Sequence, residues 1–524
     1  MNVSRGLVLS RIGHPDSRLR NSVIEFHLRG RSPREALKYY VEMRGEGTPG
    51  DSHTCAFVLK ACGMTKGLRA GRMVHGEVVK RGYVRDSFVV NGLVGMYGKC
   101  GEMDCGRKVF DEFGGKDLVG WNMMLSGYVG CSMIEEARKM FDEMHEKDVV
   151  SWSIMINAYG KRVGDIEMAR QLFDDMPIRD LVAWNSIISG YVKVGDLVTA
   201  HQLFDMMPER NIVSWTIMLD GYASQGDPLE ALKIFKRMLS KSLRIDKFSV
   251  VGALSACAQL GALIQGRWIH TYIIRNRIGT DIVIETALLD MYMKCGSLDE
   301  ACRIFSGMHK RNVVSYTVMM LGFGMNGHGR KALEYFYQML AENIQPDNML
   351  LLGVLTACSH AGLLMEGIHI FHQMKRFHEI EANIEHYCCL VDLLGRAGLL
   401  DYALSVIESI PLKSCPALWG SLLFACQKHQ NVSMAEIAAQ NLMELKADDC
   451  GTYVLFSKVY ADIGLQGESL RIWDMMKNKK MKKEIGSSSI EVDGNIKEFV
   501  SGECDLSQEL KWFIFSLFSV ATDL

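Results

Sequence analysis

Cysteine is the residue type in this chain with the widest chemistry, because thiols can bind metals, form disulfides or act as nucleophiles. The sequence contains 15 cysteines, and no two of them stand in a Cys-x-x-Cys pair. Six occupy matching places, either after Ala in an apolar segment or within Lys-Cys-Gly: Cys62, Cys257, Cys358, Cys426, Cys100 and Cys295. This pattern indicates small buried residues in a reducing compartment rather than zinc ligands. No metal or other cofactor is expected.

Other residue types also lack a catalytic arrangement. No nucleophile with a base, no carboxylate pair and no phosphate-binding glycine loop stands out. The polar residues that do recur are Asp or Asn placed directly before LVGWN, VVSWS, LVAWN and IVSWT. An Asp or Asn in such a place is a good helix N-cap, because its side chain accepts a hydrogen bond from a free backbone amide. We therefore expect no catalytic residues and no small-molecule substrate.

These polar residues are positioned by repeats. Trp121, Trp152, Trp184 and Trp215 stand 31, 32 and 31 residues apart. A fixed period of roughly 20 to 50 residues is typical of a solenoid, in which each unit buries its apolar face against its neighbours. The sequence therefore predicts a stack of similar units rather than one globular core.

Each repeat predicts two helices joined by a glycine turn. Aromatic residues seven positions apart, such as Trp121 and Tyr128, share one face of the first helix. The second helix carries Ala, Phe and Met at spacings of four and three, as in Ala137, Phe141 and Met144. The glycines expected at the turn are Gly101, Gly195, Gly226, Gly261, Gly296, Gly327, Gly362 and Gly398. The fold class is all-α, with most of the 33 methionines in the core.

Composition describes an ordered chain without a strong charge. Hydrophobic residues make up 48%, charged residues 23%, and the formal net charge is -2. These values exclude a disordered chain and a generally basic nucleic-acid binder, so any contact with RNA must come from local patterning. No apolar run approaches the ~18 residues of a membrane span, so no membrane partner is expected.

The repeats resemble a known family. Hairpins of about 31 and 35 residues, the VVSW openings, and the strings VLKAC, LLDMYMKCGSLDEA and VLTACSHAGLLMEG resemble the pentatricopeptide repeat (PPR) proteins of plants, PLS subclass. LWGSLLFACQKHQNVSMAEIAAQNLMEL and YVLFSKVYADIGLQGE resemble the E-type extension of that subclass, and IGSSSIEVDGNIKEFVSGE resembles the start of its E-plus motif. The resemblance implies a right-handed superhelical solenoid of helix-turn-helix repeats that binds single-stranded organellar RNA.

The predicted organisation has five parts. Residues 1–20 are Arg- and Ser-rich and acid-poor, as in an organellar transit peptide, with the mitochondrion favoured and the chloroplast as the alternative. Residues 21–415 hold about twelve repeats, 416–483 the E-type extension, 484–503 a partial E-plus motif, and 504–524 a divergent tail. Where longer relatives continue into a DYW-type deaminase domain, this sequence ends in LSQELKWFIFSLFSVATDL, so we expect a deaminase to act in trans.

In the family, the fifth residue of a repeat and its last residue together read one RNA base. Carried over by position, the reading pairs are Asn91 with Asp117, Asn122 with Asp148, Ser153 with Asp180, Asn185 with Asn211, Thr216 with Asp246, Thr286 with Asn312, and Thr317 with Asp347. The implied code from the repeat that begins at Ser87 to the one that ends at Asp347 is U, U, G, C or U, G, any, A, G, written 5′ to 3′. Capping alone would explain the last residue of each pair, but it leaves the polar fifth residue inside the helix unexplained.

Two further sets of residues fit a groove that follows the strand. Apolar residues at position two sandwich the bases in the family, and here they are Phe88, Val119, Val150, Val182, Val213, Phe248, Val283 and Val314. Lysines at position thirteen could meet phosphates, and here they are Lys99, Lys161, Lys193 and Lys294. Simple core packing and solvated turn lysines remain the respective alternatives.

Some repeats depart from the pattern. The repeat from Val149 to Asp180 has one extra residue in its KRVGD turn, and Ser132 replaces a turn glycine. Reading positions without a useful hydrogen-bonding group are Ala56, Val251, Leu352, Cys388 and Cys415. We expect those repeats to read weakly or not at all.

The resemblance favours a sequence-specific RNA-binding factor for organellar C-to-U editing. RNA stabilisation and splicing are alternatives within the family. A protein-binding scaffold of the tetratricopeptide kind is the alternative outside it, but the Trp-x-x-Leu-Gly-x-x-Tyr pattern of those repeats is missing.

Overall fold

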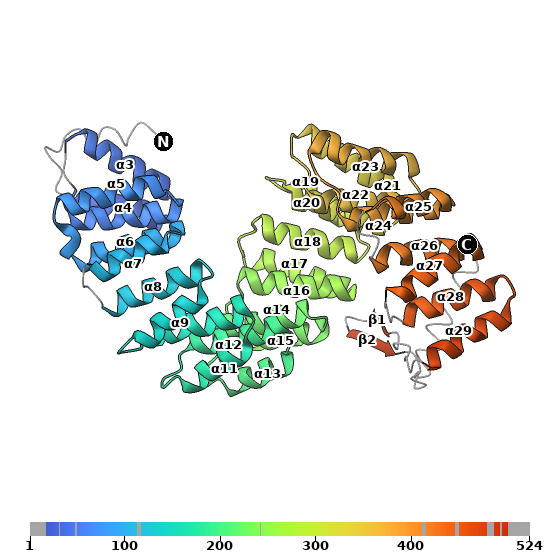
Figure 1. The fold of residues 1–524 in the computed structure, drawn as a ribbon, viewed down its shortest axis with the longest axis horizontal. Helices are drawn as coiled ribbons and strands as arrows, with labels where there is room; N and C mark the ends of the chain where they lie inside the picture. Colours follow the sequence, from blue (N-terminus) through green and yellow to red (C-terminus); the bar gives the residue numbers. More distant parts are fainter. Residues whose placement is uncertain are drawn as a thin grey trace. The chain divides into compact units, whose positions relative to one another are not determined.

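The computed structural model describes residues 17–30, 32–47, 50–112, 117–241, 243–410, 415–445, 450–478, 487–492 and 495–500. The chain divides into two compact units, Met1–Gly221 and Tyr222–Leu524. Within each unit, helical hairpins follow one another in chain order (Figure 1). The all-α solenoid that the sequence predicts is confirmed.

The first unit contains the following helices, with the unit boundary inside the last of them: α2 (Ser17–Arg29), α3 (Pro33–Gly45), α4 (Ser52–Thr65), α5 (Leu68–Lys80), the 3₁₀ turn η1 (Tyr83–Arg85), α6 (Ser87–Cys100), α7 (Met103–Glu112), α8 (Leu118–Gly130), α9 (Ile134–Glu143), α10 (Val149–Asn157), the π-helical turn η2 (Ala158–Val163), α11 (Ile166–Asp175), α12 (Leu181–Val194), α13 (Leu197–Met206) and α14 (Ile212–Ser224). The helix α2 includes Ser17–Arg20, so it overlaps the end of the predicted transit peptide, whose residues 1–16 lie outside the described part of the chain.

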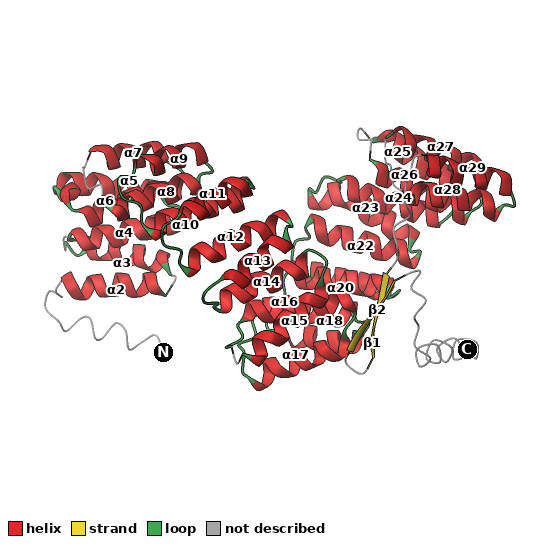
Figure 2. Ribbon diagram, turned by 90° about the horizontal axis from the view of Figure 1, so that it is seen from below, coloured by secondary structure: helices red, strands yellow, loops and turns green. Residues whose placement is uncertain are grey.

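The second unit contains α15 (Pro228–Ser240), α16 (Lys247–Leu260), α17 (Leu263–Arg275), α18 (Ile282–Lys294), α19 (Leu298–Gly307), α20 (Val313–Met325), α21 (Gly329–Ala341), α22 (Asn348–Ala361), α23 (Leu364–His378), α24 (Ile384–Arg396), α25 (Leu400–Ser409), α26 (Pro416–Lys428), α27 (Val432–Glu444), α28 (Cys450–Asp462) and α29 (Gln466–Asn478). Two strands follow, β1 (Ser487–Val492) and β2 (Asn495–Val500), which pair antiparallel with Ile490 opposite Lys497 (Figure 2). This small hairpin was not predicted, and the tail at 504–524 lies outside the described residues.

The first helix of each repeat begins at the Asp or Asn that the sequence marked. Asp117 accepts from the backbone amide of Gly120 at 2.7 Å, and Asp148 accepts from that of Ser151 at 2.8 Å. The same N-cap bond is made by Asp51, Asp86, Asp180, Asn211, Asp246, Asp281, Asn312, Asp347 and Asn383. The predicted capping role is therefore confirmed.

Glycine ends the first helix because the next turn requires a left-handed backbone. All eight predicted turn glycines have positive φ, from +65° at Gly261 to +89° at Gly195 and Gly226. Ser132 takes the same place in its repeat with φ of +62°, which is costly for a residue that has a Cβ atom. The sequence interpretation of this turn is confirmed.

The extra residue of the KRVGD turn is absorbed by a π-helical turn. The segment Ala158–Val163 is π-helical, and Gly164 closes it with φ of +80°. Gly160 in this turn packs directly on α12, since a Cβ atom added to Gly190 would lie 3.3 Å from the Gly160 Cα. An insertion of one residue is thus accommodated locally, as in other π-bulges.

The core lies between successive repeats. The Ala, Phe and Met residues of the second helices are buried, including Ala137, Phe141 and Met144. Where position four of the next repeat is aromatic, the Phe ring meets it edge to face, with centroid distances of 5.1 Å for Phe110–Trp121, 4.9 Å for Phe141–Trp152 and 4.8 Å for Phe173–Trp184. Edge-to-face pairs contribute about 0.5–1.5 kcal/mol each beyond the area they bury. The repeats are therefore joined by direct contacts between neighbours.

Among the described helices, none is both long and apolar enough to cross a bilayer.

Candidate nucleic-acid interface

The predicted reading residues with an Asn at position five form direct pairs. The Nδ2 of Asn122 donates to both carboxylate oxygens of Asp148 at 3.1 Å, and that of Asn91 donates to Asp117 at 3.3 and 3.4 Å. Asn185 makes a longer contact of 3.5 Å with Asn211. The structure thus brings each pair together between the first helix of one repeat, which holds the Asn, and the N-cap of the first helix of the next repeat.

The amide oxygens of the same Asn residues have no partner. In the described part of the chain, six buried side-chain polar atoms lack a hydrogen bond, and four of them are at position five: the Oδ1 atoms of Asn91, Asn122 and Asn185, and the Oγ atom of Ser153. A buried polar atom without a partner costs about 1–3 kcal/mol. N-capping cannot explain this cost, because the capping residue is the other member of each pair. These four positions belong to four consecutive repeats.

Electrostatics follow from the same contacts. Burial alone raises the pKa of the Asp148 carboxyl, but hydrogen bonds from Ser151 and Asn122 outweigh it and hold the pKa below its ordinary value. Asp148 therefore presents a carboxylate, an acceptor without a proton, beside the Asn122 amide at neutral pH.

Threonine at position five behaves differently from Asn. The hydroxyls of Thr216, Thr286 and Thr317 donate to the carbonyl four residues earlier, at 2.8, 2.6 and 2.9 Å. The short Thr side chain forms this local bond, as is common in helices. Each hydroxyl oxygen keeps lone pairs that can accept a hydrogen bond from a ligand.

One further pair of the same kind was missed in the sequence. Asn21 is the fifth residue of the first repeat, and its Nδ2 donates to the two oxygens of Asp51 at 3.0 and 3.1 Å. Its Oδ1 accepts from the Thr54 hydroxyl at 2.6 Å. The signal that could have found it is the position count, since Asn21 is the fifth residue counted from Ser17 and Asp51 is the last residue of that repeat. Asn21 with Asp51 is therefore a fourth pair in which an Asn at position five donates directly to the last residue of its repeat.

The apolar residues at position two are exposed. Their exposed fractions run from 47% at Phe88 to 63% at Phe248, with Val119, Val150, Val182, Val213, Val283 and Val314 in between. They are not part of the core, so the packing alternative fails. Each stands three residues before position five of its repeat, and its side chain is open to a ligand.

The four predicted phosphate lysines lie in different surroundings. Lys99 is exposed and forms no ion pair within the described residues, whereas Lys294 pairs with Asp290 at 2.9 Å. Lys193 donates to the carbonyl oxygen of Lys161. Burial, aided by the nearby Lys193 charge, lowers the pKa of Lys161. These contacts leave Lys99 best placed to meet an anion.

The repeats that depart from the pattern show no comparable pair. Ala56 is buried, and Val251 and Leu352 offer no polar group. Cys388 and Cys415 do lie together, and burial with the neighbouring Cys415 thiol raises the pKa of Cys388 to about 12. A thiol with so high a pKa is a poor nucleophile at neutral pH.

No candidate catalytic centre appears in the described part of the chain. No group of three or more His, Cys, Asp or Glu side chains there could hold a metal ion. One His-x-Glu sequence, His75 to Glu77, is present, but both side chains already have partners within the protein. Tyr97 contacts His75 at 2.9 Å, and Arg44 and Arg81 pair with Glu77 at 2.5 and 2.6 Å.

Comparison with known proteins places this geometry in context. The family model described as PPR repeat matches residues 20–48, 119–149, 150–181, 182–212, 213–243, 286–313, 314–344, 353–378 and 385–415, and that described as E motif matches residues 429–491. Pentatricopeptide repeat-containing protein At3g29230 of Arabidopsis thaliana is 44% identical over 94% of this chain and 82% of its own length. At1g59720 of the same plant, chloroplastic/mitochondrial, is 32% identical over 90% of this chain and 61% of its own length.

The chain spans less than two thirds of At1g59720 and of a third relative, At1g31920. Among solved structures, the pentatricopeptide repeat protein PPR10 from maize superposes with a TM-score of 0.52 at 18% identity, covering 90% of this chain and 75% of PPR10. This likeness shows the same fold.

Proposed function

The chain belongs to the pentatricopeptide repeat family and carries its E motif, and from that premise we propose that it binds single-stranded RNA in a sequence-specific manner. The observation that carries the proposal is the set of unpartnered buried polar atoms of Asn91, Asn122, Ser153 and Asn185. The Watson-Crick edge of an unpaired base supplies the donors that such atoms lack.

The other parts of the interface support the same ligand. Exposed apolar side chains at position two can pack on base faces, because every base has an apolar face. The hydrogen-bonding pairs then contact base edges from the side. PPR10, a protein of this fold, has been solved in complex with an 18-nt psaJ RNA element.

The finer function we propose is that of a specificity factor for organellar C-to-U editing. The E motif at 429–491 supports this, since in the family that extension accompanies editing factors. The chain would bind next to an editing site and a DYW-type deaminase would act in trans. The mitochondrion is the proposed compartment, with the chloroplast as the alternative, because relatives carry both designations in their names.

The binding experiment compares two forms of one sequence. A fluorescent RNA containing the implied order U, U, G, C, G, A, A, G is titrated as a single strand and after annealing to its complement. We expect tight binding of the single strand and binding of the duplex at least about a hundred-fold weaker, since the edges are then occupied. Equal affinity would refute a groove that reads unpaired bases.

The editing step is tested in the plant. Organellar transcripts from a loss-of-function line are sequenced and searched for an unedited cytidine downstream of the implied sequence. Normal editing at every site together with a change in transcript ends or splicing would favour the stabilisation or splicing alternatives.

A further inference from the structure

Three arginines that precede a predicted reading residue share one geometry. The Nε atoms of Arg179, Arg210 and Arg311 donate to the carbonyls of Phe173, Phe204 and Phe305 at 2.9, 2.7 and 3.2 Å. Their Nη2 atoms donate to the next carbonyl along, at 2.7, 2.6 and 3.3 Å. These carbonyls lie in the last turn of the second helix, where backbone oxygens no longer accept from the amide four residues later and carry partial negative charge. Each guanidinium therefore caps that helix.

The same guanidiniums lie over aromatic rings. The distances to the ring centroids of Phe173, Phe204 and Phe305 are 5.0, 5.0 and 4.8 Å, which is cation–π range. The same rings also pack edge to face against Trp184, Trp215 and Tyr316 of the next repeat. The guanidinium, the Phe ring and the aromatic ring of the next repeat thus form a continuous set of contacts between the two repeats.

A lysine provides a natural variant of this contact. Lys147 donates to the carbonyl of Met144 at 2.8 Å and lies 5.2 Å from the Phe141 centroid. Its repeat also ends in a reading residue, Asp148. The basic charge is therefore common to these repeats, while the second carbonyl bond is particular to Arg.

The residue that follows each basic residue is fixed from the other side. Asp148, Asp180, Asn211 and Asn312 all accept from a backbone amide of the next helix, at 2.8, 2.8, 3.0 and 2.9 Å. The basic residue thus bonds to the C-terminal end of the preceding helix, and the Asp or Asn after it bonds to the N-terminal end of the next helix. The predicted reading side chain lies where these two contacts meet.

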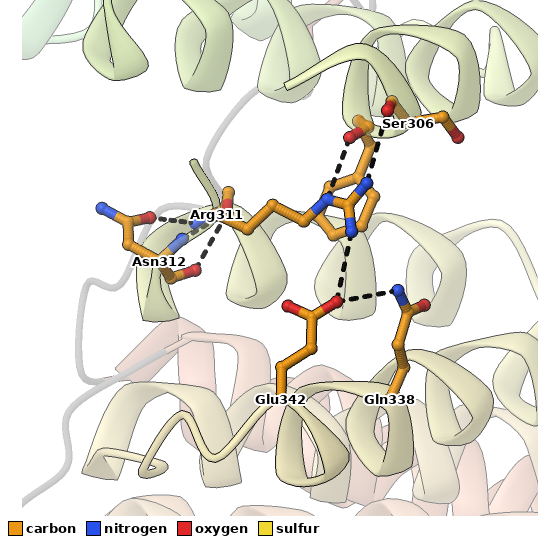
Figure 3. A network of polar contacts seen from close by, with 7 residues as sticks. Ser306, Arg311, Asn312, Gln338 and Glu342 are labelled. Atoms are coloured by element: carbon orange, nitrogen blue, oxygen red, sulfur yellow. Dashed lines mark hydrogen bonds and ion pairs between the residues drawn. The ribbon is translucent and has the colours of Figure 1, made fainter. Parts of the chain in front are cut away.

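Arg311 shows the fullest version (Figure 3). Besides its two carbonyl bonds, its Nη1 donates to Glu342 of the following repeat at 3.2 Å, and Gln338 donates to the same carboxylate oxygen at 3.2 Å. The Arg311 side chain is only 25% exposed. The charge of Arg311 is thus paired with Glu342 inside the protein, which disfavours a contact with a phosphate of the RNA.

We propose that Arg311 and its counterparts Lys147, Arg179 and Arg210 are positioning residues for base reading, which fix the side chain that follows them in the sequence. The proposal rests on the proposed function, because it assigns a role in reading RNA. The two competing roles are a direct phosphate contact and a purely structural helix cap.

The test uses Arg311→Gln and Arg311→Lys in the full chain, with Arg303→Gln as the control. Arg303 is exposed on α19, the helix whose end Arg311 caps, so its substitution removes the same charge without touching the contacts of Arg311. The probes are the single-stranded RNA above with A or G at the seventh nucleotide, which the repeat from Ile282 to Asn312 is expected to read. Affinity is measured at several salt concentrations.

We expect Arg311→Gln to reduce the preference for A over G about five-fold, as for the loss of one net hydrogen bond. Preferences at the other nucleotides and the salt dependence should stay as in the wild type, and Arg311→Lys should restore most of the preference. Arg303→Gln should match the wild type.

Two results would overturn the proposal. A fall of about 0.7 in the slope of log affinity against log salt would indicate a lost phosphate contact. An unchanged A-over-G preference in a folded but less stable Arg311→Gln protein would indicate a structural cap alone.

A wild-type protein with no preference at the seventh nucleotide would instead refute the base reading itself. If Arg311→Gln does not fold, Lys147→Gln poses the same test at the second nucleotide with a single carbonyl bond lost.

Discussion

Substitution of Asn312 by Asp should change the base preference of one repeat from A to G. In the structure, the Oδ1 of Asn312 accepts from the Ser315 amide at 2.9 Å, and its backbone amide donates to the Ser315 hydroxyl at 3.1 Å. Its Nδ2 makes no hydrogen bond to another described residue, so it is the atom available to RNA. Asp keeps the capping oxygen and replaces this one donor with an acceptor.

The magnitude follows from that single atom. Adenine N1 is an acceptor and needs the Nδ2 donor, whereas guanine N1–H is a donor and needs an acceptor. The Thr286 hydroxyl is common to both readings, since it donates to Ile282 and can accept from the base. One base contact is worth about 1–3 kcal/mol, so the preference should shift about ten-fold or more. Stability should hardly change, because Asp caps a helix about as well as Asn.

The assay measures affinity for RNAs with A or G at the seventh nucleotide, with the melting temperature as the control for folding. The next repeat supplies the matched reverse change, because Thr317 with Asp347 is the Thr and Asp combination, and Asp347→Asn should favour A at the eighth nucleotide. A folded Asn312→Asp protein with the wild-type preference would show that Asn312 only caps its helix and would refute the assignment.

Three further predictions concern single side chains. Ser132→Gly should raise the free energy of unfolding, measured with denaturant, by about 0.5–1 kcal/mol, because glycine tolerates the left-handed backbone at φ of +62°. The reverse change Gly195→Ser should lower it, and a loss of stability in Ser132→Gly would contradict this account of the turn. Asn122→Leu should keep the free energy of unfolding within about 1 kcal/mol of the wild-type value, since removing the unpartnered oxygen offsets the lost bond to Asp148. The affinity for RNA with U at the second nucleotide should fall about ten-fold, whereas equal losses of stability and of binding would indicate a structural role for Asn122. The pKa of Asp148 is lower in the folded protein, so its carboxylate contributes stability that is present above the unfolded pKa of about 4 and is lost as pH falls through the folded pKa. The difference in free energy of unfolding between wild type and Asp148→Asn should therefore shrink between pH 5 and pH 2. A constant difference would show that the carboxylate charge contributes nothing.

Local signals explain why much of the fold could be predicted. The Trp period, the capping Asp and Asn residues and the turn glycines each act within a few residues, so the sequence shows them directly. The exposure of the position-two side chains could not be predicted, because an apolar residue near a helix start fits either a core or a surface. The structure alone separates these alternatives.

Long-range contacts explain what could not be predicted. Arg311 reaches a carboxylate 31 residues later, and nothing in the local sequence indicates that partner. The pair of Asn21 with Asp51 was missed, although the same position count from Ser17 identifies both residues. The extra residue near Lys161 was visible, but its conversion into a π-helical turn depends on the close approach of Gly160 and Gly190.

The exposed apolar residues of the first unit have a consequence for the protein without its ligand. Phe88, Val119, Val150, Val182 and Val213 are each about half exposed and recur once per repeat. Apolar surface of this kind promotes association between molecules in solution. The free protein should therefore be prone to aggregate at concentrations where the RNA-bound form remains dispersed. Under the proposed function, its working lifetime in the cell would then depend on the supply of the RNA that it binds.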